Sequence, residues 1–361
     1  MDDPGLLEVV VVNFNGRETL PGTLSALVEA GIRPEQIILS DDASTDGSPE
    51  EAARTYPGIR MVRQQRNLGS ANGVRNAGLA LVGARYAFLT DNDIIVTRES
   101  LQLLLQVLLS TPGAVIVTPR LVDASQPDEI RHDGNRLHFL GLSGDSPRGL
   151  PVDYLPSPSV RPTFGGGIMM FDTRVGKRIG WMDCGYRQGW ASDAEVQLRV
   201  RALGYEALHE SRATMTHFGK NHGTRRALGQ MSNRYRLILT YFSWYTILIL
   251  LPSLGCFEIA LTLTAIKLGV LDQRIDALRT TWRSRKELRL RRSEIQTQRQ
   301  RSDLELLTAG SFELPGVARE RAGARALMHI ASFFLGLNWQ ILRMIMRFRG
   351  DAGRGHAHVA R

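Results

Sequence analysis

The stretch LTDNDIIVT, residues 89–97, places Asp91 and Asp93 one residue apart between two apolar runs. Two carboxylates this close repel each other unless water solvates both at a turn or a cation lies between them. Mg²⁺ and Mn²⁺ take oxygen ligands of this kind and commonly share them with a diphosphate. Taken alone, such a pair fits a solvated turn better than a metal site. The neighbouring sequence therefore has to decide between the two.

Four short apolar runs in the first quarter of the chain predict a sheet. They are EVVVVN (8–13), QIILS (36–40) and the stretches 59–63 and 86–90, and helical patterns separate them. Strands that alternate with helices form a mostly parallel sheet with helices on its faces. Ligands bind at the carboxyl ends of such strands, where Asn13, Asp42 and Asp91 fall. We therefore expect an α/β fold with a polar site at one edge of its sheet.

The composition is that of a globular protein, with 22% charged and 43% hydrophobic residues among 361. Much of the net charge of +9 lies in the last third, where an arginine-rich stretch predicts a basic arm facing lipid headgroups or nucleic acid. The arm lacks interleaved aromatic residues, which disfavours nucleic acid. Two cysteines are too few for a disulfide framework or a zinc site and favour a reducing compartment. The N-terminus shows no pattern of a signal peptide.

Three further segments contribute candidate binding residues. They are DDAS (41–44), NLGSANGVRNAG (67–78) and FGGGI (164–168). The carboxylate of Asp42 can accept hydrogen bonds from a base or a ribose. Asn67 lies in a glycine-rich loop that allows close backbone approach, Arg75 offers a cation to phosphate, and Gly166 would let a ligand lie against the main chain. Each segment also has a structural explanation, as a capped turn, a loop-to-helix junction or sheet-edge packing.

The segment GWASDAEVQLRVRALGY (189–205) predicts a helix with an acid at its start. Ser192 and Glu195 match a capping box, which predicts a structural role for Glu195. Asp193 then falls at the first helical position, where the helix dipole favours its anion, and a carboxylate held there can act as a general base. Complementation of the dipole is the alternative. His217, after a predicted short strand, is either a packed side chain or a metal ligand.

The order of these segments resembles that of family 2 glycosyltransferases, in the branch of bacterial rhamnosyltransferases and galactofuranosyltransferases. Seven pieces occur in the expected order over about residues 6–222: VVNFNG, DDASTDGS, NLGSANGVRNAG, LTDND, GGGIMMFDTRVGKRIGWMD, SDAEVQLRVRALGY and TH. The resemblance implies the GT-A fold, a Rossmann-like nucleotide-diphospho-sugar transferase domain, over residues 1–230.

The resemblance also implies roles for individual residues. In that family the second acid of the DDAS element contacts the nucleobase, the D-x-D acids bind metal and sugar nucleotide, and the acid at the start of the late helix is the catalytic base, here Asp193. The residues expected to bind the nucleotide sugar are Asn13, Asp42, Asn67, Arg75, Asp91 and Gly166, and those expected to bind Mg²⁺ or Mn²⁺ are Asp91, Asp93 and His217. The family commonly has Glu-Asp at this helix, whereas here Ser192 precedes Asp193, which would carry the base role alone.

The implied reaction is an inverting, metal-dependent transfer of a sugar, with rhamnose as the best guess, from a nucleotide-diphospho-sugar. The expected acceptor is a hydroxyl of a lipid-linked glycan in cell-surface polysaccharide assembly. Transfer onto a polyprenyl phosphate is one alternative, although it needs no base. A nucleotidyltransferase would need a glycine-rich loop after the first strand, and NFNGRETL lacks it. A non-catalytic sugar-nucleotide-binding module is disfavoured by the co-occurrence of so many candidate site residues.

The last third predicts helices that meet a membrane. Apolar runs at 237–251 and 256–271 are separated by PSLG, and each is shorter than the ~20 residues of a spanning helix. They predict a hairpin that is either buried against the catalytic domain or associated with the membrane, with basic flanks that stay cytosolic. We expect 231–350 to be a helical region at the cytoplasmic face of the plasma membrane, peripheral or with a short inserted hairpin, and 351–361 to be a disordered tail. Self-association into a homo-oligomer is left open.

Overall fold

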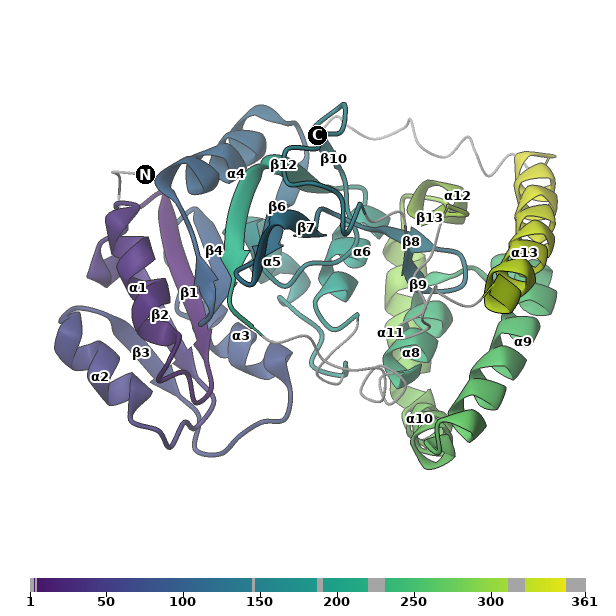
Figure 1. Cartoon of the computed structure of the whole chain (residues 1–361), viewed down its shortest axis with the longest axis horizontal. Coiled ribbons are helices and arrows are strands. Elements are labelled where there is room, and N and C mark those ends of the chain that lie inside the picture. The colour runs from purple at the N-terminus through teal and green to yellow at the C-terminus, as the bar shows by residue number, and fades with distance from the viewer. Residues whose placement is uncertain are drawn as a thin grey trace.

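The computed structural model contains an α/β region followed by a helical region (Figure 1). It describes residue 3 and residues 5–144, 147–186, 191–219, 231–310 and 322–348, with the side chains of the last segment described from 334 to 347. The predicted fold class, an α/β sheet flanked by helices with a helical C-terminal region, is confirmed, and the sheet is mixed where a mostly parallel one was expected. The predicted disordered tail, 351–361, lies outside the described residues.

One large sheet organises the α/β region. Its order is β10 (Val160–Pro162), β12 (Glu206–His217), β6 (Ala114–Asp123), β11 (Met169–Asp172), β4 (Tyr86–Asp91), β1 (Leu7–Asn13), β2 (Ile37–Asp41) and β3 (Arg60–Arg63), while β5 (Ile94–Ile95) pairs with β12 and β7 (Gln126–His132) with β6. As predicted, β1 to β4 are parallel, and β11 runs antiparallel to both of its neighbours. The carboxyl ends of the parallel strands therefore meet at one edge.

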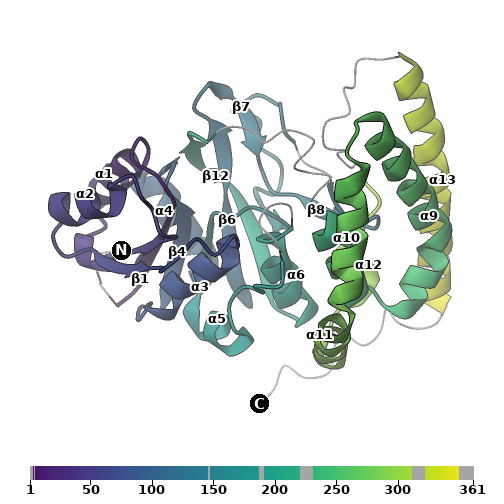
Figure 2. The same ribbon diagram turned by 90° about the horizontal axis from the view of Figure 1, so that it is seen from below.

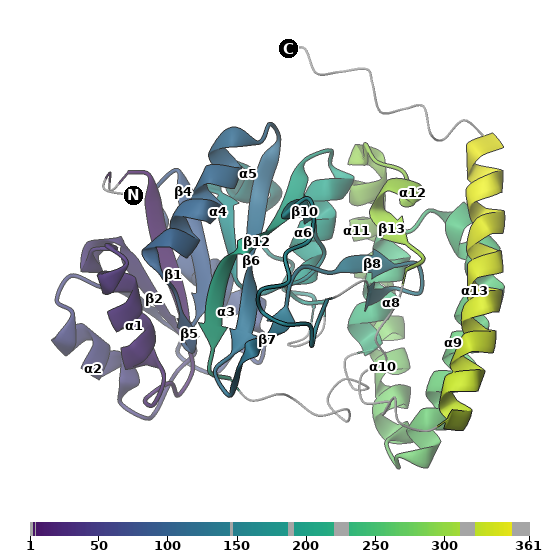
Figure 3. The same cartoon turned by 45° about the horizontal axis from the view of Figure 1, so that its top comes forward.

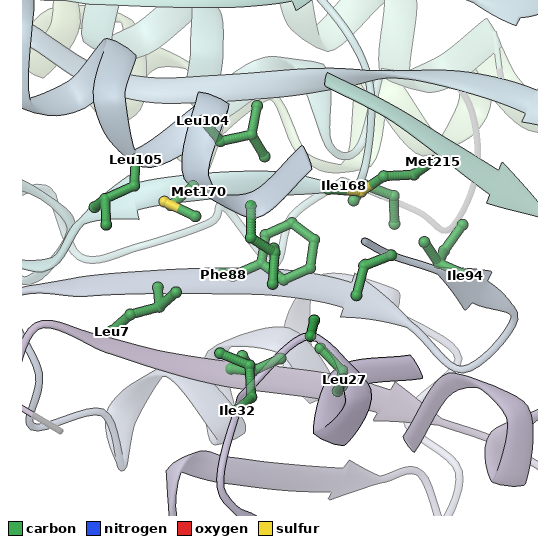
Figure 4. Packing of buried hydrophobic residues seen from close by; sticks show 14 of the residues in the cluster. Leu7, Leu27, Ile32, Phe88, Ile94, Leu104, Leu105, Ile168, Met170 and Met215 are labelled. Atoms are coloured by element: carbon green, nitrogen blue, oxygen red, sulfur yellow. The ribbon is translucent and has the colours of Figure 1, made fainter. Parts of the chain in front are cut away.

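Strand β1 lies inside the sheet because its valine run is covered on both faces. Val9 and Val11 belong to one apolar cluster, and Val10 belongs to another on the opposite face. Figure 4 shows the first cluster, in which Phe88 lies between residues of neighbouring strands and helices. Helices α1 (Leu20–Glu29), α2 (Ser48–Thr55) and α4 (Arg98–Ser110) contribute to this cluster, and α3 (Ala71–Ala80), α5 (Thr173–Ile179) and α6 (Ala194–Ala202) contribute to the other.

Residues 111–165 are rich in proline, glycine and aspartate, a composition that predicts loops with short strands, but the segment begins with a long strand. Strand β6 is 10 residues long, and all but its last residue are buried. Arg120 lies inside this strand and is buried because Asp133 accepts hydrogen bonds from its Nε and Nη2 at 2.9 and 3.0 Å. Arg120 makes this stretch look unlike a central strand in the sequence, but Asp133 neutralises its charge within the fold.

A second, three-stranded sheet joins the two regions. It consists of β13 (Leu307–Thr308), β8 (Arg136–His138) and β9 (Leu142–Gly144). Although β13 comes from the helical region, it pairs in parallel with β8 of the α/β region. Nearby, the rings of Phe139 and Trp339 stack with centroids 5.4 Å apart. The two regions predicted on either side of residue 230 therefore share a sheet and an apolar core.

The expected hairpin broken at PSLG is wrong. The helices of the C-terminal region are α8 (Met231–Tyr241), α9 (Trp244–Lys267), α10 (Leu271–Arg283), α11 (Arg285–Gln298), α12 (Asp303–Leu306) and α13 (Ala322–Phe348). The break comes earlier, between α8 and α9, and α9 then runs for 24 residues through Pro252. Among the described residues, α9 is the one helix that is long and apolar enough to cross a membrane, judged by length and composition alone.

The arginine-rich stretch forms helices that pack on α8 instead of a free arm. Arg292 of α11 donates to the carbonyl oxygens of Leu239 and Phe242 at 2.6 and 2.8 Å. Arg299 donates to the carbonyl oxygen of Tyr241 at 2.7 Å. These carbonyls lie at the C-terminal end of α8, where helical partners are lacking and positive charge is favoured. Part of the basic charge is therefore structural.

A buried arginine fastens α9 to the rest of the protein. Arg234 of α8 is fully buried, donates to the carbonyl oxygen of Leu140 at 2.7 Å and pairs with Glu258 of α9. Glu258 also accepts a hydrogen bond from the Tyr235 hydroxyl at 2.7 Å and pairs with Arg274 of α10 at 2.5 Å. Burial works to raise the pKa of the Glu258 carboxyl, but Arg234 and the other donors outweigh it and hold that pKa below its usual value.

Replacing Glu258 with alanine should destabilise the protein, because Arg234 would stay buried without its partner. Breaking a fully buried pair costs about 3–5 kcal/mol, and since Glu258 is 30% exposed we expect a loss near the bottom of that range or below it. The midpoint of thermal unfolding should fall by several degrees. Glu294→Ala removes a half-exposed partner of Arg291 and should hardly change the midpoint. Equal midpoints for the two variants would show that the Arg234 pair contributes no stability.

Candidate active site

The side chain of Asn13 holds the end of β1 in place. It is fully buried. Its Nδ2 donates to Asp41 Oδ1 at 2.8 Å and lies 3.2 and 3.0 Å from the hydroxyls of Ser44 and Ser48, while its Oδ1 accepts from Asn92 Nδ2 at 2.7 Å. Both polar atoms are therefore engaged within the protein. The structure places Asn13 at the predicted edge of the sheet, where it positions neighbouring elements and has no free polar atom to offer a ligand.

Asn92, between the two acids of the D-x-D turn, gains a role that its sequence position does not reveal. It ties the turn after β4 to the end of β1, 79 positions earlier in the chain. Gly16 leaves the space for this bond, since a Cβ there would lie 2.0 Å from Asn92 Nδ2 and 2.3 Å from Asn13 Oδ1. A side chain at position 16 would push the two asparagines apart.

The two acids of the DDAS turn have different environments. Asp41 is fully buried, and it accepts hydrogen bonds from Asn13 and from the backbone N–H of Ser44. Asp42 accepts the backbone N–H of Leu68 through Oδ1 at 2.9 Å. Burial raises the pKa of the Asp42 carboxyl, and the bond from Leu68 opposes the rise. Asp41 therefore stabilises the turn. The side chain of Asp42 is instead oriented by Leu68 of the glycine-rich loop.

Arg75, Asp91 and Asp193 converge around Gly167. Nη2 of Arg75, on α3, lies 3.3 Å from Asp91 Oδ1 at the end of β4. A Cβ at Gly167 would lie 2.8 Å from that Nη2 and 3.3 Å from Asp193 Oδ2. Because glycine has no side chain, a cation and a carboxylate from different helices can approach the same point. Burial raises the pKa of the Asp193 carboxyl, Arg75 offsets part of the rise, and Asp91 adds to it.

Asp93 and His217 face each other where β5 pairs with β12. His217 Nε2 lies 3.5 Å from Asp93 Oδ2, and the backbone N–H of Gly219 donates to His217 Nδ1 at 3.1 Å. Burial raises the pKa of Asp93 and lowers that of His217, and the attraction between the two opposes both shifts. Nearby Asp91 raises the pKa of Asp93 further. The sequence placed these three residues together, and the structure does so too.

The carboxylates fit a divalent cation better than the imidazole does. Asp93 Oδ1 is buried and has no hydrogen-bond partner among the described residues, so an oxygen ligand is available there. His217 accepts the Gly219 N–H at Nδ1, which places the proton of the neutral ring on Nε2, the nitrogen that faces Asp93. It could bind a metal through Nε2 only after a change of tautomer. Across the described ranges, no group of three or more His, Cys, Asp and Glu residues is arranged to hold a metal ion.

The glycine segment before β11 is held by Gln197 of α6. Gln197 Oε1 accepts the N–H of Gly165 at 2.8 Å, and its Nε2 donates to the carbonyl oxygen of Gly166 at 3.0 Å. The predicted binding residue Gly166 therefore lies on a strip of backbone fixed against the helix that Asp193 begins. Asn67 is exposed and accepts the N–H of Gly69 at 2.8 Å, so its oxygen stabilises its own turn next to the Leu68–Asp42 bond.

Comparison with known proteins assigns this arrangement to a family. A model described as glycosyl transferase family 2 matches residues 8–168, which contain the ends of β1, β2 and β4 and the glycine segment. This part of the chain is similar to glycosyl transferase family 2. Its curated relatives match over short stretches. The N-acetylglucosaminyl-diphospho-decaprenol L-rhamnosyltransferase of Mycobacterium tuberculosis is 36% identical over 78 residues, which are 22% of this chain and 25% of that protein. The succinoglycan biosynthesis protein ExoO of Rhizobium meliloti is 31% identical over 133 residues, 36% of each chain.

Solved structures share the fold of this chain. The structure of GalNAc-T7 with UDP, GalNAc and Mn²⁺ has a TM-score of 0.52 at 15% identity and covers 70% of this chain and 51% of that one. The structure of S. aureus TarS 1–349 with UDP-GlcNAc has a TM-score of 0.50 at 13% identity and covers 76% of this chain and 79% of that one. At these identities the likeness shows a GT-A-like fold and nothing finer.

The predicted capping box at the start of α6 is wrong. Asp193, one residue after the predicted Ser192, is the N-cap residue, and its side chain makes no capping hydrogen bond. Glu195 instead accepts a hydrogen bond from the Tyr241 hydroxyl of α8 and lies 3.8 Å from Arg291 of α11. The C-terminal helices therefore hold α6 two residues after Asp193. The partners of Glu195 are distant in the chain, so local pattern could not reveal them.

Asn72 is a second residue that sequence reasoning missed. It is fully buried in the first turn of α3, and its Nδ2 donates to the carbonyl oxygens of Ser192 and Asp183 at 2.7 and 2.9 Å. It thereby fixes the backbone immediately before Asp193. The only sequence signal for Asn72 is its place within the glycine-rich segment 67–78.

Replacing Gly16 with alanine should disrupt the site while leaving the core intact. The new methyl group would collide with the Asn13–Asn92 bond, so the D-x-D turn should move and binding of nucleoside diphosphates should weaken by about tenfold or more. Titration calorimetry measures this effect. Gly22→Ala is the matched control, because a Cβ there would meet its nearest neighbour at an ordinary 3.6 Å. Native affinity in Gly16→Ala would show that this bond does not position the site.

Proposed function

We propose that the protein is an inverting glycosyltransferase that moves a sugar from a nucleotide-diphospho-sugar to a hydroxyl acceptor. The observation that carries the proposal is the convergence of Arg75, Asp91 and Asp193 around Gly167 at the carboxyl ends of the parallel strands. This edge is where α/β sheets bind ligands. There Arg75 provides a positive charge for an anionic leaving group, and the buried carboxylate of Asp193 can accept a proton. The match of residues 8–168 to glycosyl transferase family 2 supports the same reaction class.

The donor would bind along the strand ends. Asp42 would accept hydrogen bonds from the nucleobase, in line with its orientation by Leu68. Arg75 would contact the diphosphate, since its guanidinium is nearly buried and is 3.3 Å from one carboxylate oxygen. Gly166 and its neighbours would leave the backbone open to the sugar. Asn13 and Asn67 would act by positioning the turns that carry these groups.

Asp91 and Asp93 would hold a divalent cation, Mg²⁺ or Mn²⁺, with His217 as a further ligand after its change of tautomer. When bound, the cation supplies positive charge against the diphosphate leaving group. The unsatisfied Asp93 Oδ1 supports this assignment. Carboxylate oxygens and diphosphate oxygens are the ligands that both cations prefer.

Asp193 would act as the general base. The acceptor oxygen attacks the anomeric carbon from the face opposite the diphosphate, and the bond from that carbon to the diphosphate oxygen breaks. The proton of the acceptor hydroxyl passes to the Asp193 carboxylate, and the configuration of the anomeric carbon inverts. The raised pKa of Asp193 suits this role, because a carboxylate with a higher pKa is a stronger base.

The sugar and the acceptor are proposed from the relatives. One relative is named an L-rhamnosyltransferase that acts on a diphospho-decaprenol, and another is named for succinoglycan biosynthesis. We propose rhamnose as the sugar, a lipid-linked glycan as the acceptor and cell-surface polysaccharide assembly as the process. The apolar helix α9 supports association with a membrane, for which we propose the cytoplasmic face of the plasma membrane. Transfer onto a polyprenyl phosphate is the second candidate, and it would not require Asp193.

Asp193→Asn should abolish sugar transfer and leave nucleotide binding largely unchanged, because the amide fills the same space but cannot take a proton. Loss of a general base lowers the rate by about 10²–10⁴-fold. The measurement is release of nucleoside diphosphate from a panel of sugar nucleotides, deoxythymidine-diphospho-rhamnose among them, with hydroxyl and phosphate acceptors. Asp128→Asn, on the exposed strand β7, is the control. Near-native turnover of Asp193→Asn with a phosphate acceptor would favour the second candidate, and with a hydroxyl acceptor it would exclude the assigned base.

The pH profile should depend on Arg75. Asp193 must be ionised to accept a proton, so kcat falls as the pH drops through its raised pKa. Arg75 lowers that pKa, and its removal should raise it. In Arg75→Gln, the acid limb of the kcat profile should therefore move to higher pH, besides any loss of rate. Arg60→Gln removes an arginine that pairs with Glu8 elsewhere and should leave the limb in place. An unmoved limb in Arg75→Gln would mean that another group sets it.

A further inference from the structure

Helix α9 presents an apolar stripe to the outside of the protein. Most of its large exposed residues are three, four or eight positions apart, which places them on one side of the helix. They are Trp244, Tyr245, Leu248, Leu251, Ile259, Leu263 and Ile266. Leu248 and Leu263 are 64% and 62% exposed. Apolar side chains this exposed along a whole helix mark a contact surface in soluble proteins.

Helix α13 places a second stripe beside the first. Its exposed apolar residues are Phe334, Leu337, Ile341 and Met344. The two helices lie side by side at one end of the molecule (Figures 2 and 3). Asn338 of α13 joins them, because its Nδ2 donates to the carbonyl oxygen of Ile249 at 2.9 Å and its Oδ1 accepts from the Ser253 hydroxyl at 2.5 Å. We call the exposed faces of α9 and α13 together the apolar plate.

The chemistry of the plate fits lipid better than protein. Interfaces between proteins carry about one hydrogen bond per 100–200 Å², yet the α9 stripe offers side-chain polar groups only at its first two residues, Trp244 and Tyr245. Amphipathic aromatic rings of this kind favour the boundary between acyl chains and water. Arg292 stacks over Trp244 at 4.1 Å, which adds positive charge at the same end of α9.

Basic residues at both ends of the plate extend this pattern. Lys267 ends α9 and is exposed, and Arg347 lies in the last turn of α13. Helix α10 follows directly and carries exposed Trp282 under the guanidinium of Arg285, at 4.7 Å. An apolar face with arginine and lysine at its edges is the pattern of helices that bind anionic lipid surfaces.

The internal contacts of α9 argue that it does not cross the bilayer. A spanning helix would have lipid around its middle, but Glu258, in the second half of α9, pairs with Arg234 and Arg274. Arg234 in turn donates to the carbonyl oxygen of Leu140 in the α/β region. Pulling α9 through a membrane would carry these charges into hydrocarbon or leave Arg234 buried without a partner.

We infer that the apolar plate lies in the plane of an anionic membrane surface, with the α9 and α13 stripes among the upper acyl chains and the α/β region in water. The inference rests on the membrane association proposed above. It adds which surface binds the membrane, and that this surface lies in the membrane plane without spanning the bilayer. It does not depend on the sugar-transfer reaction, because lipid binding needs no donor or acceptor.

Flotation with vesicles of phosphatidylethanolamine and phosphatidylglycerol tests the surface. The full-length protein should float with the vesicles, and the double variant Leu248→Glu/Leu263→Glu should lose about tenfold or more of its binding, since two exposed leucines become charged. Ile341→Glu tests α13 in the same way. Leu109→Glu is the matched control, because Leu109 is 61% exposed on α4, outside the plate, and should keep native binding. Thermal unfolding checks that each variant is folded.

The two cysteines report the mode of binding. Cys256 lies on the exposed side of α9, and Cys184 is exposed in the α/β region. Vesicles should slow maleimide labelling of Cys256 and leave that of Cys184 unchanged. Protein on labelled vesicles should also exchange onto unlabelled ones, which a spanning helix could not do. Three results would overturn the inference: no flotation, equal flotation of the Leu248→Glu/Leu263→Glu and Leu109→Glu proteins, or a solution dimer that Leu248→Glu dissociates, which would make the plate a contact between copies.

Discussion

The hydrogen bond between the buried side chain of Asn13 and the partly buried side chain of Asn92 is the constraint on which the site depends. It joins the end of β1 to the turn after β4, and Asn13 at the same time holds Asp41 at the end of β2. Three strand ends are thereby fixed relative to one another by one carboxamide that has no contact with water. A buried amide is costly unless its donors and acceptor are all satisfied, so the arrangement tolerates little displacement.

Burial and neighbouring charges set the pKa of each acid in the site separately. Asp193 is buried beside Arg75, which leaves its pKa raised but limits the rise. The start of α6, where Asp193 lies, is held from both sides. Asn72 binds the backbone before it, and Tyr241 and Arg291 of the C-terminal helices bind Glu195 after it. The C-terminal region therefore helps to position the proposed base, in addition to the proposed role of its exposed face in lipid binding.

The sequence predicted the sheet and the edge at which the candidate residues lie because these rest on local patterns. Apolar runs followed by asparagine or aspartate predicted β1, β2 and β4 and placed Asp42, Asp91 and Asp93 at one edge. It did not predict what depends on distant partners. Asn92 finds its acceptor 79 positions away, and Glu195 finds Tyr241 46 positions away. The break expected at PSLG failed because burial of Ser253, Leu254 and Phe257 outweighs the one helical hydrogen bond that Pro252 lacks.

The central claim is that this edge of the sheet binds a nucleotide-diphospho-sugar through its acids and a divalent cation. Titration calorimetry with a panel of nucleoside diphosphates, with Mn²⁺ and with chelator, tests it most directly. We expect one nucleotide to bind more tightly than the others in the presence of Mn²⁺. Asp93→Ala should abolish the effect of Mn²⁺, and Asp42→Ala should remove the preference among bases. Absence of binding by every nucleotide with Mn²⁺ present, or binding that neither variant changes, would contradict the account.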